Sequence, residues 1–266
     1  MSELAPRPQP PGPVVVLEPA GDGAEAARQL ASSLGLALVR EPGGCYALRF
    51  RDGRLELLAP HPDMGPLSVD FLNGEMAHRL RQAAHADEGL ARAVGARGDP
   101  GPRVIDATGG LGRDAAVLAR RGCRVTILER EPVIAALLED GLHRGRGGMG
   151  TVAEGLHRIR LVENDARAYL ASCAETEGPD VIYLDPMYPE RRKSALVRKE
   201  MRIFRAIAGD DRDAEELLAA ALVAARQRVV VKRPTRAPSL GGPAPSGAVR
   251  RGHTRFDIYA GACLSG

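Results

Sequence analysis

The chain has 266 residues, of which 44% are apolar and 27% charged, and its net charge is +3. This length and composition are typical of a globular protein with one large domain and a small appendage at most. No apolar run reaches the ~20 residues of a membrane span, no C-x-x-C pair indicates a disulfide framework or a zinc site, and the Pro-rich start lacks the apolar core of a secretory signal. The sequence therefore predicts a cytoplasmic protein with reduced thiols, no membrane partner and no bound metal.

The first part of the chain predicts a small α/β appendage. Its Pro-rich first 13 residues are expected to be extended or disordered. The elements that follow are a strand at 14–17, a helix at 24–34, and a hairpin of strands at 46–50 and 55–58 around a Gly-containing turn. Three prolines and a glycine between positions 60 and 66 mark a boundary. We therefore predict two domains, residues 1–65 and 66–266.

Short apolar runs alternate with amphipathic helical patterns through the second part of the chain. The predicted strands are 104–105, 124–128, 159–162, 181–184, 228–231 and 256–259, and the predicted helices are 73–94, 113–121, 133–142, 166–174 and 214–225. This alternation predicts an α/β fold, with a mostly parallel sheet and helices on both faces. In such folds ligands bind beyond the carboxyl ends of the strands, where the strand order reverses.

A glycine-rich loop directly follows the first of these strands, in the sequence Asp106-Ala-Thr-Gly-Gly-Leu-Gly-Arg-Asp114. Glycines at 109, 110 and 112 let the backbone turn tightly and approach a ligand. Glu129 ends the next strand, where its carboxylate can accept both hydroxyls of an adenosine ribose. The pattern also fits the relaxed dinucleotide fingerprint. However, the carboxylates of Asp106 and Asp114 disfavour a pyrophosphate and favour the cationic S-adenosylmethionine.

A second motif, Asp185-Pro186-Met187-Tyr188, ends a buried strand further along the chain. An exocyclic amine of a base is a poor nucleophile, because its lone pair is delocalised into the ring. The Asp185 carboxylate and the Pro186 carbonyl can accept hydrogen bonds from such an amine as it becomes tetrahedral, and Tyr188 can stack on the base. These three residues are the predicted catalytic groups. No general base is required, because the methylated amine can lose its proton to water.

Basic residues are concentrated directly after this motif. Seven Lys or Arg and two Glu lie between positions 190 and 205. We predict that the first of them contact RNA phosphates beside the acceptor pocket, namely Arg191, Arg192, Lys193, Arg198 and Lys199. A solvated helix surface is an equally good interpretation of the charge pattern alone. His253, near three arginines, is more simply interpreted as part of a solvated loop.

Taken together, these motifs resemble the RsmJ-type 16S ribosomal RNA guanine-N2 methyltransferases. The segments that carry the resemblance are VDFLNGEMAHR at 69–79, DATGGLGRDAAVLA at 106–119, GCRVTILEREPVIAALLEDGL at 122–142, VIYLDPMYP at 181–189, KSALVRKEMRIF at 193–204, VVVKRP at 229–234 and RFDIYAG at 255–261. The resemblance implies a class I methyltransferase fold, S-adenosylmethionine as donor with S-adenosylhomocysteine as product, and N2 methylation of one guanosine in 16S rRNA.

The resemblance also implies which residues bind the cofactor. Together with Asp106, Gly110 and Gly112 of the loop, they are Arg113, Asp114, Glu129, Arg130, Asn164, Asp165 and Asp185. The Asn164-Asp165 pair departs from the small hydroxyl residues expected at that position, and Met187 departs from the Asp-Pro-Pro-Tyr pattern of amino methyltransferases in general. Neither the oligomeric state nor the choice between naked rRNA and the small ribosomal subunit as substrate follows from the sequence.

Two alternative functions are open on the motifs alone. An NAD(P)-dependent oxidoreductase would explain the glycine loop but not the Asp185 motif. A non-enzymatic RNA-binding module would explain the basic residues but not the glycine loop with Glu129. His78 and Arg79 could contact RNA, or could equally form a cap or a salt bridge.

Overall fold

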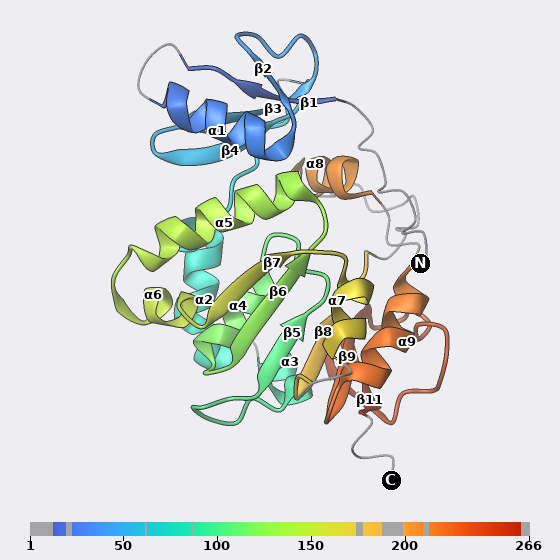
Figure 1. The fold of residues 1–266 in the computed structure, drawn as a ribbon. Helices are drawn as coiled ribbons and strands as arrows, with labels where there is room; N and C mark the ends of the chain where they lie inside the picture. The colour runs from blue at the N-terminus through green and yellow to red at the C-terminus, as the bar shows by residue number, and fades with distance from the viewer. Residues whose placement is uncertain are drawn as a thin grey trace. The chain divides into compact units, whose positions relative to one another are not determined.

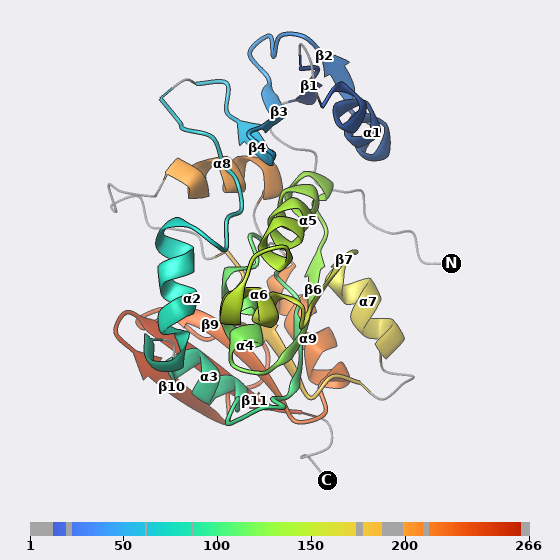
Figure 2. The ribbon, with the colours of Figure 1, turned by 90° about the vertical axis from the view of Figure 1, so that its left-hand side faces the viewer.

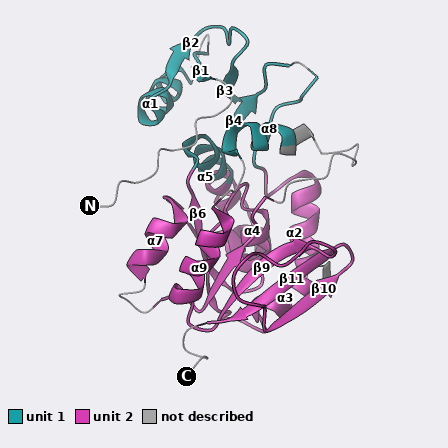
Figure 3. Cartoon of the chain, turned by 90° about the vertical axis from the view of Figure 1, so that its right-hand side faces the viewer, with its two compact units in different colours: residues 1–69, 131–141, 189–210 teal, residues 70–130, 142–188, 211–266 magenta. Residues whose placement is uncertain are grey.

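The computed structural model describes residues 13–19, 23–61, 63–86, 88–173, 178–187, 199–209 and 213–261. The chain divides into two compact units (Figure 3). Unit 1 comprises residues 1–69, 131–141 and 189–210, and unit 2 comprises residues 70–130, 142–188 and 211–266. The division at residue 65 that the sequence indicates stays a prediction, and the Pro-rich first 12 residues lie outside the described part of the chain.

Unit 1 contains a four-stranded sheet in the order β2-β1-β3-β4. Its elements are β1 (Val14–Leu17), α1 (Ala24–Leu34), β2 (Ala37–Val39), β3 (Tyr46–Arg51), β4 (Arg54–Leu58), the first part of α5 (Pro132–Arg146) and α8 (Lys199–Ala208). Strand β1 is parallel to β2 and β3, and β3 and β4 form the predicted antiparallel hairpin. Asp52 and Gly53, at the turn, have φ of 51° and 71°, as a two-residue type I′ turn requires.

Unit 2 contains a seven-stranded sheet in the order β10-β11-β9-β8-β5-β6-β7 (Figure 1). The strands are β5 (Arg103–Asp106), β6 (Arg124–Glu129), β7 (Ile159–Glu163), β8 (Val181–Leu184), β9 (Arg228–Pro234), β10 (Gly247–Arg251) and β11 (Thr254–Ala260). The first five are parallel, and β11 is antiparallel to both β9 and β10. The chain builds outward from β5 to β7 and then returns to place β8 on the other side of β5. The strand order therefore reverses between β5 and β8, where a ligand site is expected.

Helices cover both faces of this sheet, as the sequence predicts. On one face α2 (Gly74–Ala86) and α6 (Gly150–Leu156) pack against α4 (Arg113–Arg120), and α3 (Glu88–Val94) packs against β10 and β11 (Figure 2). On the other face α7 (Ala166–Cys173) packs against α9 (Ala214–Ala224). The central strands are buried on both sides: all four residues of β8 are buried. This explains why they appear in the sequence as continuous apolar runs rather than as alternating patterns.

The sequence predictions and the structure differ in a few elements. The single helix predicted at 73–94 is described as two, α2 and α3. Strand β2, helices α6 and α8 and the edge strand β10 were not predicted. The predicted α/β class, with a mostly parallel sheet between two layers of helices, is confirmed.

Candidate active site

The glycine loop leads from the end of β5 into α4. Gly110 and Gly112 have φ of 53° and 68°, a left-handed region that glycine adopts at little cost. Gly109 packs against β6 so closely that a Cβ there would lie 2.4 Å from Ile127 Cγ2 and 2.8 Å from the Leu128 carbonyl oxygen. Only glycine therefore fits at position 109, and the other two glycines turn the chain into the helix.

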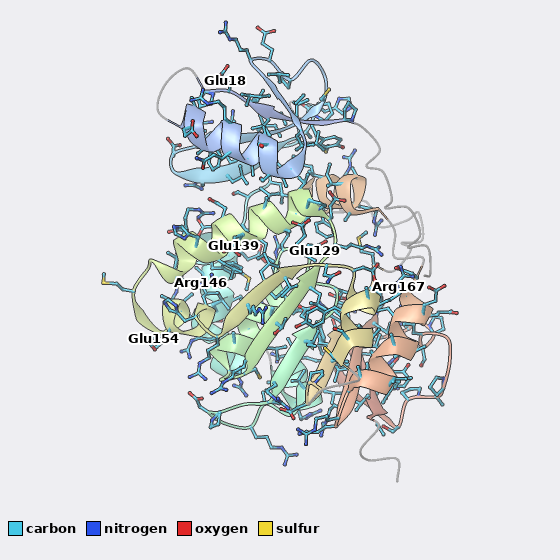
Figure 4. The ribbon with its side chains drawn as sticks, viewed as in Figure 1. Glu18, Glu129, Glu139, Arg146, Glu154 and Arg167 are labelled. Atoms are coloured by element: carbon cyan, nitrogen blue, oxygen red, sulfur yellow. The ribbon has the colours of Figure 1, made fainter. Side chains whose placement is uncertain are left out.

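Glu129 ends β6 and is labelled in Figure 4. Its side chain is buried, and its Oε2 accepts a hydrogen bond of 2.8 Å from the backbone N–H of Gly110. The structure thus joins two sequence-predicted site residues that are 19 positions apart. Because a carboxylate can accept several hydrogen bonds at once, Glu129 can both hold the loop and accept ribose hydroxyls.

The predicted residues after β6 and β7 also contact other parts of unit 2. Arg130 Nη1 lies 2.7 Å from Asp213 Oδ2. Asp165 Oδ1 accepts hydrogen bonds from the backbone N–H of Arg167, at 2.8 Å, and of Ala168, at 3.3 Å, so Asp165 caps the first turn of α7. Burial opposes ionisation of Asp165, but hydrogen bonds from the Arg167 side chain and from the backbone outweigh it and lower the pKa. Asp165 is therefore ionised at neutral pH and can accept hydrogen bonds on both oxygens.

Asn164 joins the ends of β6 and β7. Its backbone N–H donates a 3.0 Å hydrogen bond to the carbonyl of Glu129. This bond places the Asn164-Asp165 pair directly beside Glu129. Arg113, the remaining predicted contact, is the first residue of α4 and is half-buried.

A group of charges centred on the buried Asp114 lies next to the glycine loop. Asp114, in the first turn of α4, accepts hydrogen bonds from Arg79 Nη2 at 2.7 Å, Tyr183 OH at 2.6 Å and Lys232 Nζ at 2.8 Å. Burial alone would raise the pKa of Asp114, but the charges of Lys232 and Arg79 hold it well below its ordinary value. Asp114 is therefore a buried carboxylate with three donors, as a buried charge needs.

Asp106, at the end of β5, has a raised pKa, in contrast to Asp114. Burial raises its pKa to about 7, and the nearby charges of Asp114 and Asp185 act in the same direction. Its Oδ1 accepts a 3.2 Å hydrogen bond from the backbone N–H of Thr108. Near neutral pH, Asp106 can therefore take up or release a proton, whereas Asp114 cannot.

The acceptor motif contacts both the glycine loop and the charge group around Asp114. The backbone N–H of Asp185 donates a 2.7 Å hydrogen bond to Thr108 Oγ1 in the glycine loop. Asp185 Oδ2 lies 2.8 Å from Lys232 Nζ, so this ammonium bridges Asp185 and Asp114. The Asp185 side chain is 41% exposed, whereas that of Asp114 is 10% exposed. Asp185 is thus the carboxylate of this group that a substrate can reach. Pro186, the next residue, is buried.

Some of the predicted residues lie outside the described part of the chain, namely Tyr188, Arg191, Arg192, Lys193 and Arg198. Lys199 begins α8, which belongs to unit 1. The sequence interpretation missed three contributors, Thr108, Tyr183 and Lys232. The sequence could have indicated a role for Lys232. This lysine directly follows the apolar run Val229–Val231 and lies within the same strand, β9.

The donor set of this edge fits S-adenosylmethionine. Carboxylates end four neighbouring strands, at Asp106, Glu129, Asp165 and Asp185. The sulfonium, ammonium and ribose hydroxyls of S-adenosylmethionine are all positively charged or able to donate hydrogen bonds. The pyrophosphate of a dinucleotide would instead meet like charges. Among the residues that the structure describes, no group of three or more acidic, His or Cys side chains could hold a metal ion.

Comparison with known proteins agrees with this chemistry. A family model described as "Putative SAM-dependent methyltransferase" matches residues 29–261. The ribosomal RNA small subunit methyltransferase J of Thioalkalivibrio sulfidiphilus is 51% identical over 88% of this chain and 92% of its own length. That of Pseudomonas aeruginosa is 48% identical over 90% of this chain and 91% of its own. The chain belongs to the ribosomal RNA small subunit methyltransferase J family.

A solved structure supports the fold of this family member. The SAM-dependent methyltransferase NGO1261 from Neisseria gonorrhoeae superimposes with a TM-score of 0.72 at 30% identity, covering 94% of this chain and 96% of its own. The chain is thus a class I methyltransferase with S-adenosylmethionine as its methyl donor, and the NAD(P)-dependent oxidoreductase alternative is not supported. No helix in the described ranges is long and apolar enough to cross a membrane.

Proposed function

We propose that the protein methylates the exocyclic N2 amine of one guanosine in the 16S rRNA of the small ribosomal subunit, in the cytoplasm. The observation that carries the proposal is the half-exposed carboxylate of Asp185 at the point where the strand order reverses, tied through Thr108 to the glycine loop. The relatives named for methylation of small-subunit rRNA support the choice of substrate.

In this proposal Asp185 and Pro186 localise the lone pair of the target amine. The Asp185 carboxylate and the Pro186 carbonyl accept its two N–H groups, and these contacts strengthen as the nitrogen becomes tetrahedral and positive. S-adenosylmethionine supplies the electrophilic methyl group. Tyr188 holds the base by stacking. After transfer, the positively charged nitrogen loses its extra proton to water.

Lys232 is a positioning residue in this mechanism. Its ammonium lies 2.8 Å from Asp185 Oδ2 and 2.8 Å from Asp114 Oδ2, and Asp114 is itself fixed by Arg79 and Tyr183. One oxygen of Asp185 is thereby held by a half-buried partner that is also bound to Asp114. This restricts the orientation of the carboxylate before the base arrives. The carboxylate of Asp114 is committed to three donors within the protein, so we propose that it acts on the reaction through Lys232.

The remaining predicted contacts hold the cofactor. We propose that Glu129 accepts the ribose hydroxyls, and that Asn164 and Asp165 at the adjacent strand end bind the adenine amine. Glu129→Ala tests this assignment: S-adenosylhomocysteine binding, measured by calorimetry, should weaken by about 1.5–3 kcal/mol, because hydrogen bonds to a charged acceptor are lost. Unchanged affinity in a folded variant would remove Glu129 from the site.

The reaction itself is tested with methyl-labelled S-adenosylmethionine and unmodified small subunits or their purified rRNA. Digestion to nucleosides followed by mass spectrometry should find one N2-methylguanosine per rRNA. The two substrates, compared at equal concentration, show whether assembly is required. Label at another atom, or no label on either substrate with an enzyme that binds S-adenosylhomocysteine, would refute the proposed function.

A further inference from the structure

The β10–β11 hairpin ends at the same edge of the large sheet as the acceptor motif. Because β11 runs antiparallel to β9, its first residue, Thr254, pairs with Pro234 at the carboxyl end of β9. Gly252 and His253 form a two-residue turn between the paired residues Arg251 and Thr254, and Gly252 has φ of 55°. Thr235, after β9, holds the turn by donating hydrogen bonds from its backbone N–H to the His253 carbonyl, at 2.9 Å, and from its hydroxyl to the Gly252 carbonyl, at 3.1 Å, so both loops meet at this edge.

The register shows how close this turn lies to the acceptor. Leu184, next to Asp185, pairs with Val231 on β9, and the neighbouring Lys232 pairs with Phe256 on β11. The outermost strand, β10, is three strand spacings from β8. With about 4.8 Å between strands and 3.3 Å per residue, the hairpin turn lies about 15 Å from Asp185. One bound segment of nucleic acid can reach both positions.

Three exposed arginines surround the turn: Arg236 after β9, and Arg250 and Arg251 at the end of β10. Successive residues of a strand point to opposite faces. Arg250 shares a face with its cross-strand partner Arg255, whereas the stem of Arg251 packs near Gly89 of α3. Arg250 and Arg251 therefore lie on opposite faces of the sheet, at the end of β10.

These three arginines are not paired with an acidic side chain among the residues that the structure describes. Arg255 is buried and bound to Asp257 at 2.7 Å, but Arg236, Arg250 and Arg251 make no ion pair with another residue in the part of the chain that the structure describes. No Asp or Glu lies between Leu217 and Phe256, so the loop between β9 and β10, strand β10 itself and the turn between β10 and β11, which together carry the three arginines, contain no acidic residue. Glu215 contacts the loop from outside this stretch, but at Gly241. This local excess of positive charge is the electrostatic pattern of a phosphate-binding surface.

We propose that Arg236, Arg250 and Arg251, which we term the hairpin arginines, bind backbone phosphates of the substrate RNA next to the target nucleotide. The inference rests on the proposed function, because it assumes that the base bound at Asp185 belongs to RNA. Phosphate contacts fix the register and orientation of a nucleic acid without reading its sequence. The hairpin arginines thus place the RNA strand, while the acceptor motif holds one base of it.

The test replaces all three hairpin arginines by glutamine and compares this variant with a matched control. The control replaces Arg97, Arg124 and Arg226 by glutamine; all three are exposed and lie near the amino-terminal ends of β5, β6 and β9, at the opposite edge of the sheet. Each variant loses three positive charges, so the change in net charge is the same in both. Binding of a small-subunit rRNA transcript is measured by filter binding over a range of salt concentrations, together with S-adenosylhomocysteine affinity.

The hairpin variant should bind the transcript about 10-fold or more weaker near 0.1 M salt, and the slope of log affinity against log salt should fall by about 2, as expected for three lost contacts to single-stranded RNA. Its S-adenosylhomocysteine affinity should match that of the wild type, and the control should keep its RNA affinity. Equal losses in both variants, or none in the hairpin variant, would overturn the inference. Methylation of the same transcript by the wild type, measured with methyl-labelled S-adenosylmethionine, separates the two proposals: if it occurs, failure of the binding test concerns only the hairpin arginines and leaves the proposed function intact.

Discussion

Two groups of ion pairs at opposite edges of the large sheet show how burial changes the role of a charge. At the carboxyl edge, Asp114 is bound by Arg79, Tyr183 and Lys232 next to the glycine loop. At the amino edge, Asp99 faces Arg158 with two short contacts of 2.6 and 2.8 Å. The distances are similar, but the side chain of Asp99 is 60% exposed and that of Asp114 is 10% exposed.

The two groups differ in how far water reaches the central carboxylate. At the exposed pair, water competes with each contact and screens it, so short distances imply little stability. At the carboxyl edge Asp114 itself is buried, and its cationic partners Arg79 and Lys232 are 32% and 29% exposed, so removing Asp114 leaves two charges that water reaches only in part. Geometry alone therefore does not separate a surface pair from a functional network. Burial does, and it allows us to rank the effects of substitutions.

The largest effect is expected for Asp114→Ala. This change leaves the Lys232 ammonium and the Arg79 guanidinium without their shared buried carboxylate. The free energy of unfolding should fall by about 3 kcal/mol, the lower end of the range for a broken buried pair, because both cations are partly exposed and Lys232 keeps Asp185 as a partner. Urea denaturation at pH 7 measures it. A loss below about 1 kcal/mol would show that water enters this region and that the carboxyl edge behaves like the amino edge.

Next in size is the loss of methyl transfer in Asp185→Asn. The variant keeps the shape of the side chain but removes the negative charge that, in the proposed mechanism, stabilises the developing positive nitrogen. Single-turnover transfer at saturating S-adenosylmethionine should fall by about 10²-fold or more, with little change in RNA affinity. A near wild-type rate would mean that Asp185 does not contact the target amine.

Lys232 provides the control for this experiment. Lys232→Arg keeps a cation near Asp185 and should retain more of the rate than Lys232→Met, while both variants should bind RNA as the wild type does. If the two variants lost the rate equally while remaining folded, a positioning role for the ammonium would be wrong.

A smaller effect, which depends on pH, is expected at Asp106. Its pKa is raised from 3.8 to about 7 in the folded protein, mainly by burial. A group with a raised folded pKa contributes stability that is fully present below its unfolded pKa and is lost as pH rises through the folded value. Between pH 5 and 7 the wild type should therefore lose about 2 kcal/mol of stability relative to Asp106→Asn, which cannot ionise. A constant difference between the two proteins across this range would mean that Asp106 does not titrate there.

The sequence was sufficient to predict the parts of this edge that depend on local patterns. The glycine loop, Glu129 and the Asp185 motif each follow a short apolar run, and parallel strands bring their carboxyl ends to one edge. Their place at one edge of the sheet therefore followed from the strand alternation, whereas the strand order that makes them neighbours did not. The structure adds that Glu129 holds Gly110 directly, a contact that the sequence did not require.

What the sequence could not provide were contacts set by packing between distant elements. Lys232 lies 118 positions from Asp114 and 47 from Asp185, and nothing local to any of the three indicates the others. Short edge elements were missed for a related reason. Strand β2 has three residues, and β10 has only one buried residue, so neither shows a clear apolar pattern.

The smallest effect is expected at the amino edge, for Asp99→Ala. The hydrogen bond from Arg158 lowers the pKa of Asp99, although the carboxyl is exposed. Arg158 also donates a 3.1 Å hydrogen bond to the carbonyl of Gly122, so its guanidinium keeps one partner after the substitution and can be solvated in place of the other. The urea midpoint of Asp99→Ala should therefore equal that of the wild type within error, at both low and high salt. Methyl transfer should also be unchanged, because the proposed active site lies at the other edge of the sheet. A loss as large as that of Asp114→Ala would show that burial is not what distinguishes the two groups, and that the short contacts of Arg158 stabilise the amino edge in their own right.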